Sequence, residues 1–323
     1  MPFVPSLHDS PRDAVRLGAI GIHLPDRRDS NLELATSLGV DHDFLEHKVG
    51  VLYRSVRDVG ETTSDIAVRA FASLQANVDL PTERIEALIV VTQHPDFKVP
   101  HTAALVHNRL GLGGHCMTFD ISQGCAGFTH GVAIVTGVMD AIGLDHAVLI
   151  TSDPYSDKVL PTDRDTALLF GDAATASYFS RRGPGYRLVD ANLGTVPDSH
   201  RCLLFRDRLE MDGSTVFKHA VRQALPGLKA LLARNGLGVG DIDLFLLHQG
   251  SKYLVEYVAG KLGIPADKAP YEAVDYGNTV SSSIPLMLQR HVADGRLDRI
   301  ALSGFGVGFT WGNNLLCRVR PET

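Results

Sequence analysis

The segment "FDISQGCAGFTHGVAIV", residues 119–135, joins a strand-like run to a long apolar, helix-like run through a short turn flanked by small residues. Cys125 lies in that turn, between Gly124 and Ala126. A strand that leads through a tight turn into a buried helix is typical of layered α/β proteins. A cysteine at such a boundary either packs as a small apolar group or reacts, and both interpretations stay open at this point.

The helix-like part is the centre of the longest stretch without a formal charge, residues 121–139. It contains Ser122, Gln123, His130 and four glycines. These polar and small residues predict a buried core helix and not a membrane span.

Composition places the chain among ordinary globular proteins. It has 323 residues, of which 44% are hydrophobic and 21% charged, and a net charge of −6 without a basic block, so nucleic acid is not expected as a partner. The four cysteines form no C-x-x-C pair, and "MPFVPSLHDSPRDAV" lacks an apolar signal core. We therefore expect free thiols and a cytoplasmic protein.

Outward from residues 119–135, apolar runs rich in β-branched residues alternate with helix-like segments. The predicted strands are residues 86–93, 116–122, 146–152, 175–180, 243–249, 299–304 and 315–319. The predicted helices are residues 63–76, 103–110, 126–142, 216–234, 252–262 and 281–292. This alternation predicts an α/β protein with a mostly parallel sheet covered on both faces.

Three matched segments indicate an internal duplication. Thr92 corresponds to His248 (248 − 92 = 156), Asp120 to Asp275 (275 − 120 = 155), and the run starting at His146 to the run starting at residue 299 (299 − 146 = 153). Matches in one order at nearly one offset predict two related halves, residues 1–180 and 181–323, with the Gly-rich segment 181–194 at their junction.

The duplication places Cys125 and Asn278 at equivalent positions, each before a buried helix, and His248 at the end of a strand. Ligands of α/β sheets bind at the carboxyl ends of strands, so a two-fold related pair of halves should bring these three side chains together. A helix amino terminus lowers a thiol pKa, and we therefore expect Cys125 to be a nucleophile. Taken singly, His248 is equally a satisfied core histidine, and Asn278 a turn or capping residue.

Two other motifs give weaker indications of function. The glycines of "SGFGVGFTWGNN", residues 303–314, resemble a dinucleotide-binding turn, but a strand-like run follows where that site needs a helix. A glycine turn that directs a backbone N–H toward an oxyanion fits better. The four histidines between residues 94 and 115 have no metal-site spacing, so no metal is expected.

The chain resembles the β-ketoacyl-acyl carrier protein synthase III family of the thiolase superfamily. The resemblance rests on "VGVLYR", "GETTSDIA", "TQHPDFKVPHTAALV", "FDISQGCAGF", "DRDTALLFGDAATA", "EMDGSTVFK", "HQGS", "DYGNTVSSSIP" and "GFGVGFTWG", which follow the family's order across about residues 15 to 320. It implies a thiolase-like fold of duplicated αβαβα layers, with two halves related by a pseudo-two-fold axis. It also implies a homodimer, and acyl-CoA and a malonyl thioester as substrates without a cofactor.

By this resemblance Cys125 accepts an acyl group from acyl-CoA. His248 and Asn278 then stabilise the enolate that forms when the malonyl thioester loses CO₂, and the enolate attacks the acyl-cysteine. Neutral hydrogen-bond donors directed at an enolate oxygen suit this step. The backbone N–H groups of Cys125 and Val307 form a second oxyanion hole.

The resemblance also assigns the substrate channel. Arg164 stacks on the CoA adenine, Met211 and Gly213 form a wall of the pantetheine tunnel, and Lys218 meets the acidic carrier protein. Phe44 stands where a stacking tryptophan is common.

Three departures from the family pattern bear on binding. Ser251 replaces a tunnel-ordering asparagine in "HQGS". Tyr253 replaces a docking arginine, with Lys252 beside it. Val99 occupies the place of a phenylalanine that reaches across the dimer into the partner's acyl pocket, so we expect a starter larger than acetyl.

The same residues leave three other functions open. The cysteine could pass its acyl group to a hydroxyl or amine, as in specialised pathways, and CO₂ release would separate the two reactions. A non-catalytic partner of an active paralogue has no need of Cys125, His248 and Asn278 together. A cysteine protease also begins a helix at its nucleophile, but nothing else in the sequence matches one.

Overall fold

A nine-stranded sheet forms the centre of the computed structural model, which describes residues 14–80, 82–205 and 208–319. The strand order is β11-β12-β13-β8-β1-β7-β6-β4-β5. These strands are β1 (Arg16–His23), β4 (Ala87–Val91), β5 (Met117–Ile121), β6 (His146–Ser152), β7 (Ala174–Ser180), β8 (Gly185–Thr195), β11 (Leu244–Leu247), β12 (Arg299–Gly306) and β13 (Thr310–Val319). Two small sheets pair β2 (Arg28–Ser30) with β3 (Tyr53–Ser55), and β9 (Leu203–Phe205) with β10 (Leu209–Met211).

The helices of the described residues are α1 (Asn31–Ser37), α2 (His42–Phe44), α3 (Thr63–Asn77), α4 (Thr102–Leu110), α5 (Gly127–Ile142), α6 (Gly213–His219), α7 (Leu225–Arg234), α8 (Lys252–Leu262) and α9 (Ser283–Asp294). None of them is both long and apolar enough to cross a membrane. As expected for a core helix, α5 buries residues along its length, including Phe128, Val132 and Met139.

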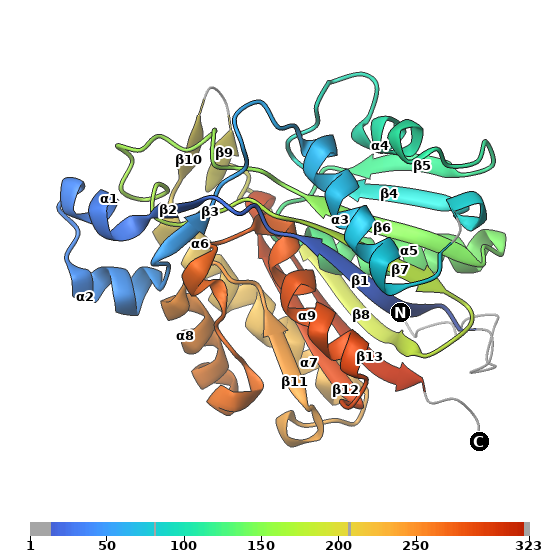
Figure 1. Ribbon diagram of the computed structural model, residues 1–323. Coiled ribbons are helices and arrows are strands. Elements are labelled where there is room, and N and C mark those ends of the chain that lie inside the picture. The colour runs from blue at the N-terminus through green and yellow to red at the C-terminus, as the bar shows by residue number, and fades with distance from the viewer. Residues whose placement is uncertain (1–13, 81, 206–207, 320–323) are drawn as a thin grey trace.

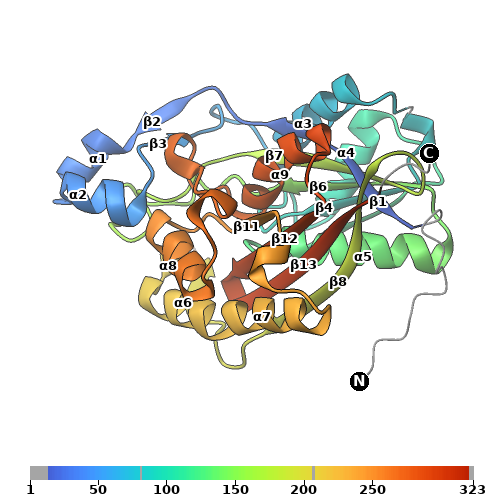
Figure 2. The same cartoon turned by 90° about the horizontal axis from the view of Figure 1, so that it is seen from below.

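The helices and strands form five layers. One core cluster packs α5 and α9 against strands of both halves, including β4 and β6 on one side and β11 and β12 on the other. A second cluster packs α3 and α4 on the outer face of β4, β6 and β7. A third packs α7 and α8 on the outer face of β11, β12 and β13. Figure 1 shows α9 in the middle of the molecule, between the strands of the two halves. Figure 2 shows α7 on the outer side of β12 and β13. The predicted αβαβα layering is confirmed.

The sheet repeats one topology in both halves. In the first, β1 pairs with β7, β7 with β6, and β6 with β4. In the second, β8 pairs with β13, β13 with β12, and β12 with β11, in the same parallel and antiparallel pattern. The halves meet where β1 and β8 pair over two residues each. This repeat supports the division at residue 180, which we keep as a proposal; its terminal residues 1–13 and 320–323 lie outside the described residues.

The prediction of a mostly parallel sheet is wrong. Only β4 with β5, β4 with β6, and β11 with β12 pair in parallel within the described sheet. The last strand of each half returns beside its predecessor, and β12 reaches β13 through the short turn Val307–Phe309. A short connection between neighbouring strands requires antiparallel pairing, which alternation of strands and helices in the sequence does not reveal.

Two long strands were not predicted. β1 is one, and β8 is the other, which occupies most of the segment predicted as the junction. The glycines and polar residues of β8 weaken its strand pattern, but ten of its residues pair with β13. The predicted helix 216–234 is divided into α6, a π-helical turn (Ala220–Ala224) and α7. Pro226 lies in the first turn of α7 and has no N–H for a helical hydrogen bond, which favours the break there.

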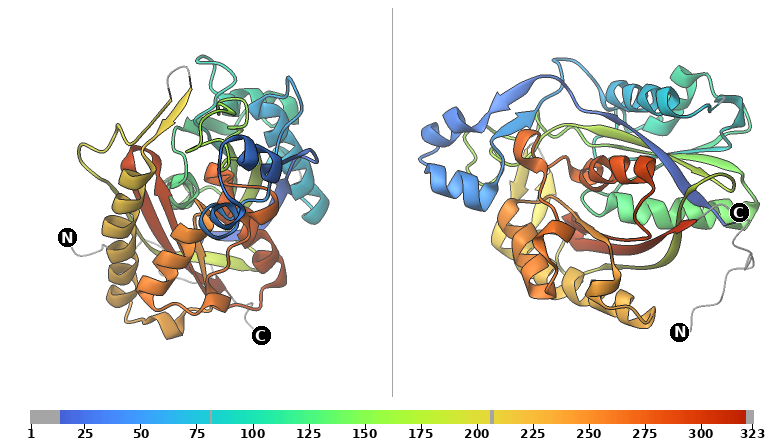
Figure 3. Two further views of the ribbon diagram at one scale, coloured as in Figure 1. Left: turned by 90° about the vertical axis from the view of Figure 1, so that its left-hand side faces the viewer. Right: turned by 60° about the horizontal axis from the view of Figure 1, so that its bottom comes forward.

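Two small units project at one end of the molecule. One comprises β2, α1, α2 and β3, and the other is the β9–β10 hairpin (Figures 1 and 3). They frame the entrance to the site described next.

Candidate active site

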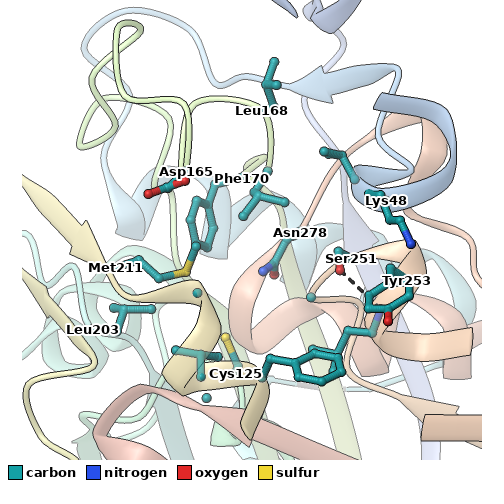
Figure 4. A pocket seen from close by; sticks show the side chains of 18 of the residues that line it. Lys48, Cys125, Asp165, Leu168, Phe170, Leu203, Met211, Ser251, Tyr253 and Asn278 are labelled. Carbon is teal, nitrogen blue, oxygen red and sulfur yellow. Dashed lines mark hydrogen bonds between the residues drawn. The ribbon is translucent and has the colours of Figure 1, made fainter. Parts of the chain in front are cut away.

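A cavity of about 470 Å³ lies among α2, β10, α6, α8 and the start of α5. Eight residues predicted for the site line it: Phe44, Cys125, Arg164, Met211, Gly213, His248, Ser251 and Asn278. They come from segments spread over more than 230 residues of sequence (278 − 44 = 234). The fold therefore brings the three candidate catalytic side chains and the predicted channel residues to one place (Figure 4).

Cys125 lies in the turn directly before α5 and is only 7% exposed. Strand β12 passes against it without side chains, because a Cβ on Gly306 would lie 2.9 Å from Sγ and one on Gly304 would lie 3.0 Å from the Cα of Ala126. Gly127 likewise lets α5 start close to Val91, which a Cβ would meet at 2.4 Å. Glycines of both halves thus bury the thiol at the meeting point of α5 and β12.

The expected lowering of the Cys125 pKa is wrong for this closed site. Burial raises the pKa of the thiol to about 12, and the nearby Asp153 carboxyl adds to the rise. A thiolate loses more solvation in an apolar pocket than the start of one helix restores. Cys125 is consequently a protonated thiol at neutral pH.

His248 follows β11, and its backbone N–H donates to the Ser303 carbonyl at 2.9 Å. Its Nδ1 lies 2.8 Å from the Ser283 hydroxyl at the start of α9. Burial lowers the pKa of His248 to about 3, so the ring is neutral. When Ser283 donates to Nδ1, the proton resides on Nε2, and the ring presents one N–H donor to the cavity.

Asn278 is held by its backbone and by its side chain. Its N–H donates to the Leu169 carbonyl at 2.8 Å, and its carbonyl accepts from the Gly171 N–H at 3.0 Å. Its Oδ1 accepts the N–H of Val280 at 2.9 Å, which turns the amide NH₂ toward the cavity. Figure 4 shows the nitrogen of Asn278 directed into the space above Cys125.

Phe44 and Arg164 lie together at the mouth of the cavity. The Arg164 guanidinium carbon is 5.5 Å from the centre of the Phe44 ring, although 120 residues separate them (164 − 44). Phe44 is 39% exposed, so one face of the pair remains open to a planar group. Ser251 caps α8 through its hydroxyl, which accepts the Leu254 N–H at 3.3 Å.

Three predicted residues, Val99, Lys218 and Lys252, are not among the described residues that line the cavity. Val99 is 86% exposed, on the loop before α4. Lys218 lies in α6, and Lys252 is the first residue of α8. Val307 begins the turn that directly follows β12, two residues after Phe305, which lines the cavity.

A cluster of three aromatic side chains at the cavity mouth was not predicted from the sequence. Phe217 stacks on Tyr253 with ring centres 5.7 Å apart and meets Tyr257 edge-on at 5.0 Å. Lys48 covers the Tyr253 ring, with Nζ 3.9 Å from its centre. These residues come from three distant segments, and no local pattern in the sequence links Lys48 to Tyr253.

An apolar cluster surrounds the thiol, and two of its members, Phe170 and Leu203, also line the cavity. Cys125 packs with Tyr155, Phe170, Leu203 and Val280, all of them buried. The Tyr155 hydroxyl donates to the side chain of Gln93 at 2.8 Å. This cluster is suited to an apolar group carried on the sulfur.

Among the described residues, no group of three or more His, Cys, Asp or Glu side chains is arranged to hold a metal ion. All four cysteines are free thiols.

Two models of protein families match the chain. Residues 119–197 match 3-oxoacyl-[acyl-carrier-protein (ACP)] synthase III, and residues 232–317 match the C-terminal region of the same synthase. The matches contain Cys125 in the first segment and both His248 and Asn278 in the second.

Relatives extend the similarity over nearly the whole chain. The β-ketoacyl-[acyl-carrier-protein] synthase III of Rhizorhabdus wittichii is 32% identical and covers 93% of this chain and 98% of its own length. The crystal structure of 3-oxoacyl-(acyl carrier protein) synthase III from Pseudomonas aeruginosa PAO1 superposes with a TM-score of 0.87 at 31% identity, covering 96% of this chain and 99% of that one. A priming β-ketosynthase of the R1128 polyketide pathway superposes at 0.86 with 26% identity, covering 98% and 100%.

Proposed function

The chain belongs to the 3-oxoacyl-[acyl-carrier-protein] synthase III family, and from that premise we propose how its cavity works. The protein is a condensing enzyme of the β-ketoacyl-acyl carrier protein synthase III type, an acyl-transferring enzyme with the thiolase fold. We propose Cys125 as its nucleophile and His248 with Asn278 as its enolate-stabilising pair. The observation that carries the proposal is that these three side chains line one cavity.

In the first proposed step, Sγ of Cys125 attacks the thioester carbonyl carbon of an acyl-CoA. The new C–S bond replaces the bond to the CoA sulfur, and the cysteine proton ends on the departing CoA thiol. Because burial keeps the thiol protonated, that proton leaves as the C–S bond forms. The backbone N–H groups of Cys125 and Val307 are the proposed donors to the oxyanion.

In the second step a malonyl thioester, carried on acyl carrier protein or CoA, places its carbonyl oxygen between Nε2 of His248 and the amide of Asn278. CO₂ leaves, and its bonding electrons form the enolate, which the two donors stabilise. The enolate carbon attacks the acyl-cysteine, a C–C bond forms, and the C–S bond breaks. The Cys125 sulfur leaves as a thiolate and takes up one proton from solvent to return to the thiol. Donors that are neutral at physiological pH suit this step, and the lowered pKa of His248 keeps it neutral.

We propose Phe44 and Arg164 for the adenine, Met211, Gly213 and Ser251 for the pantetheine arm, and acyl-CoA and malonyl thioesters as the only small-molecule partners. Lys218 and Lys252 lie on α6 and α8, the helices that border the cavity, and we assign them to docking of an acidic carrier protein. We place the enzyme in the cytoplasm, where thiols such as its four free cysteines stay reduced.

The starter unit is proposed to be larger than acetyl. Val99 is small and highly exposed in the isolated chain, which suits a side chain that enters the acyl pocket of a second copy. A small residue there leaves more room for the acyl group. Transfer of the acyl group to a hydroxyl or amine, the alternative reaction, is not favoured by the relatives, which are synthases.

The test is intact-protein mass after mixing with a panel of acyl-CoAs, with Cys125→Ala as the control. We expect a gain of one acyl group in the wild type, none in the variant, and faster labelling by acyl groups longer than acetyl. Addition of malonyl thioester should then remove the adduct and release one CO₂. Labelling of Cys125→Ala would refute the assigned nucleophile, and a strong preference for acetyl-CoA would refute the larger starter.

A further inference from the structure

The turn after Asn278 contains a strained residue. Val280 is fully buried, is branched at Cβ and has φ +54°, a left-handed conformation that such side chains rarely adopt. Non-glycine residues stay in this region only when their surroundings hold them there. Something in the structure must therefore hold Val280.

The holding contact crosses from one half of the molecule to the other. The Ser281 hydroxyl donates a hydrogen bond to a carboxylate oxygen of Asp153, and both side chains are buried. The backbone N–H of Ser281 and the side chain of Thr92 also contact this carboxylate. Asp153 directly follows β6, and its other oxygen accepts the Gln93 N–H at 2.7 Å. The carboxylate is thereby anchored on the central strands of the first half, and it restrains the residue next to Val280.

The held turn determines how Asn278 is oriented. The N–H of Val280 donates to Oδ1 of Asn278 at 2.9 Å, so the amide oxygen keeps its donor only while this turn stays in place. An amide whose oxygen is held in this way presents its NH₂ on the opposite side, where the cavity lies. If the turn relaxed, Oδ1 would lose its donor and the amide could rotate away.

From these contacts we propose that Asp153 and Ser281 are positioning residues for Asn278, which act by holding the strained turn that contains Val280 in place. This inference rests on the proposed function, because it concerns the donor assigned to the enolate. It predicts that loss of the contact impairs decarboxylation and spares the acylation of Cys125, which does not use Asn278.

The test compares the two half-reactions in Ser281→Ala. We expect CO₂ release from carboxyl-labelled malonyl-CoA to fall at least tenfold, while the rate and extent of Cys125 acylation stay within about twofold. The extent of acylation also reports the folded fraction. The matched control is Ser282→Ala, which removes another buried hydroxyl of the same turn. The Ser282 hydroxyl contacts Thr151 and not Asp153, so this variant should lower both rates equally or neither.

A rescue variant separates positioning from general destabilisation. Glycine adopts a positive φ without strain, so Val280→Gly in the Ser281→Ala background should restore much of the CO₂ release. Equal losses in both half-reactions, or no rescue by glycine, would overturn the inference while leaving the proposed function intact. If the wild-type enzyme releases no CO₂, the proposed function itself is refuted and the inference falls with it.

Discussion

Two opposite effects meet at the Cys125 sulfur. The amino terminus of α5 favours an anion, and burial in an apolar cluster disfavours one. Burial is the larger effect, and it raises the pKa of Cys125. In the proposed mechanism this protonated thiol reacts when a bound thioester supplies both the electrophile and the acceptor of the proton.

The first prediction concerns this thiol. Because the pKa of Cys125 is about 12, its thiolate fraction should rise about tenfold per pH unit between pH 7 and pH 9.5. Alkylation of Cys125 by iodoacetamide, followed by peptide mass spectrometry, should increase over this range without a plateau. A plateau with a midpoint near or below pH 8.5 would show an activated thiol. The Cys125→Ala variant identifies the contribution of Cys116, whose pKa is raised to about 11.

Among the secondary-structure elements, α5 contains one glycine that packs against a strand and one that is exposed. A Cβ on Gly131 would lie 2.8 Å from Leu149 of β6, so the helix and the strand are in close contact at that point. Gly137, two turns later and exposed, would meet nothing within 4 Å. The first glycine is therefore required by packing, whereas the second only weakens the helix.

The two positions predict opposite changes in stability. Gly137→Ala should raise the free energy of unfolding by about 0.5–1 kcal/mol, because alanine loses less backbone entropy in a helix. Gly131→Ala should lower it by about 1–3 kcal/mol through overpacking against Leu149. Urea denaturation of both variants beside the wild type measures the difference. Equal effects of the two substitutions would contradict the packing argument.

At the scale of the whole molecule, the sheet ends at β5, which pairs only with β4 within the described residues. Sheet edges with free backbone groups tend to pair with other chains. Near it, the loop before α4 exposes Phe97 and Val99, at 57% and 86%. An unpaired edge beside exposed apolar residues supports the proposed homodimer, in which Val99 reaches the partner's pocket.

Light scattering after size-exclusion chromatography tests the dimer. We expect a mass of about 70 kDa, twice the 34.9 kDa of one chain. Phe97→Asp should shift the equilibrium toward monomer, since a carboxylate is costly to bury in an interface. Val59→Asp, at an equally apolar and 96% exposed position on another loop, should leave the dimer intact. A wild-type mass of one chain, or equal effects of both substitutions, would refute the assignment.

The amino-acid sequence was enough to indicate an α/β protein, several of its central strands and a set of candidate site residues, while the αβαβα layers followed from the family resemblance. Apolar periodicity is local, so β4, β6 and α5 could be predicted from their own residues. Three matched segments, one of which pairs Thr92 with His248, have nearly the same offset and indicated the repeat. The family resemblance then supplied the role of each residue, including the channel residues Phe44 and Arg164, which the fold places together.

The direction of the strands, the place of β8, the protonation of Cys125 and the contact of Asp153 with Ser281 became apparent from the folded chain alone. Strand direction depends on which strands become neighbours, and a pKa depends on how much water the folded chain excludes. The Asp153–Ser281 contact joins residues 128 apart in sequence. Such properties arise from long-range contacts, which no local pattern of residues contains.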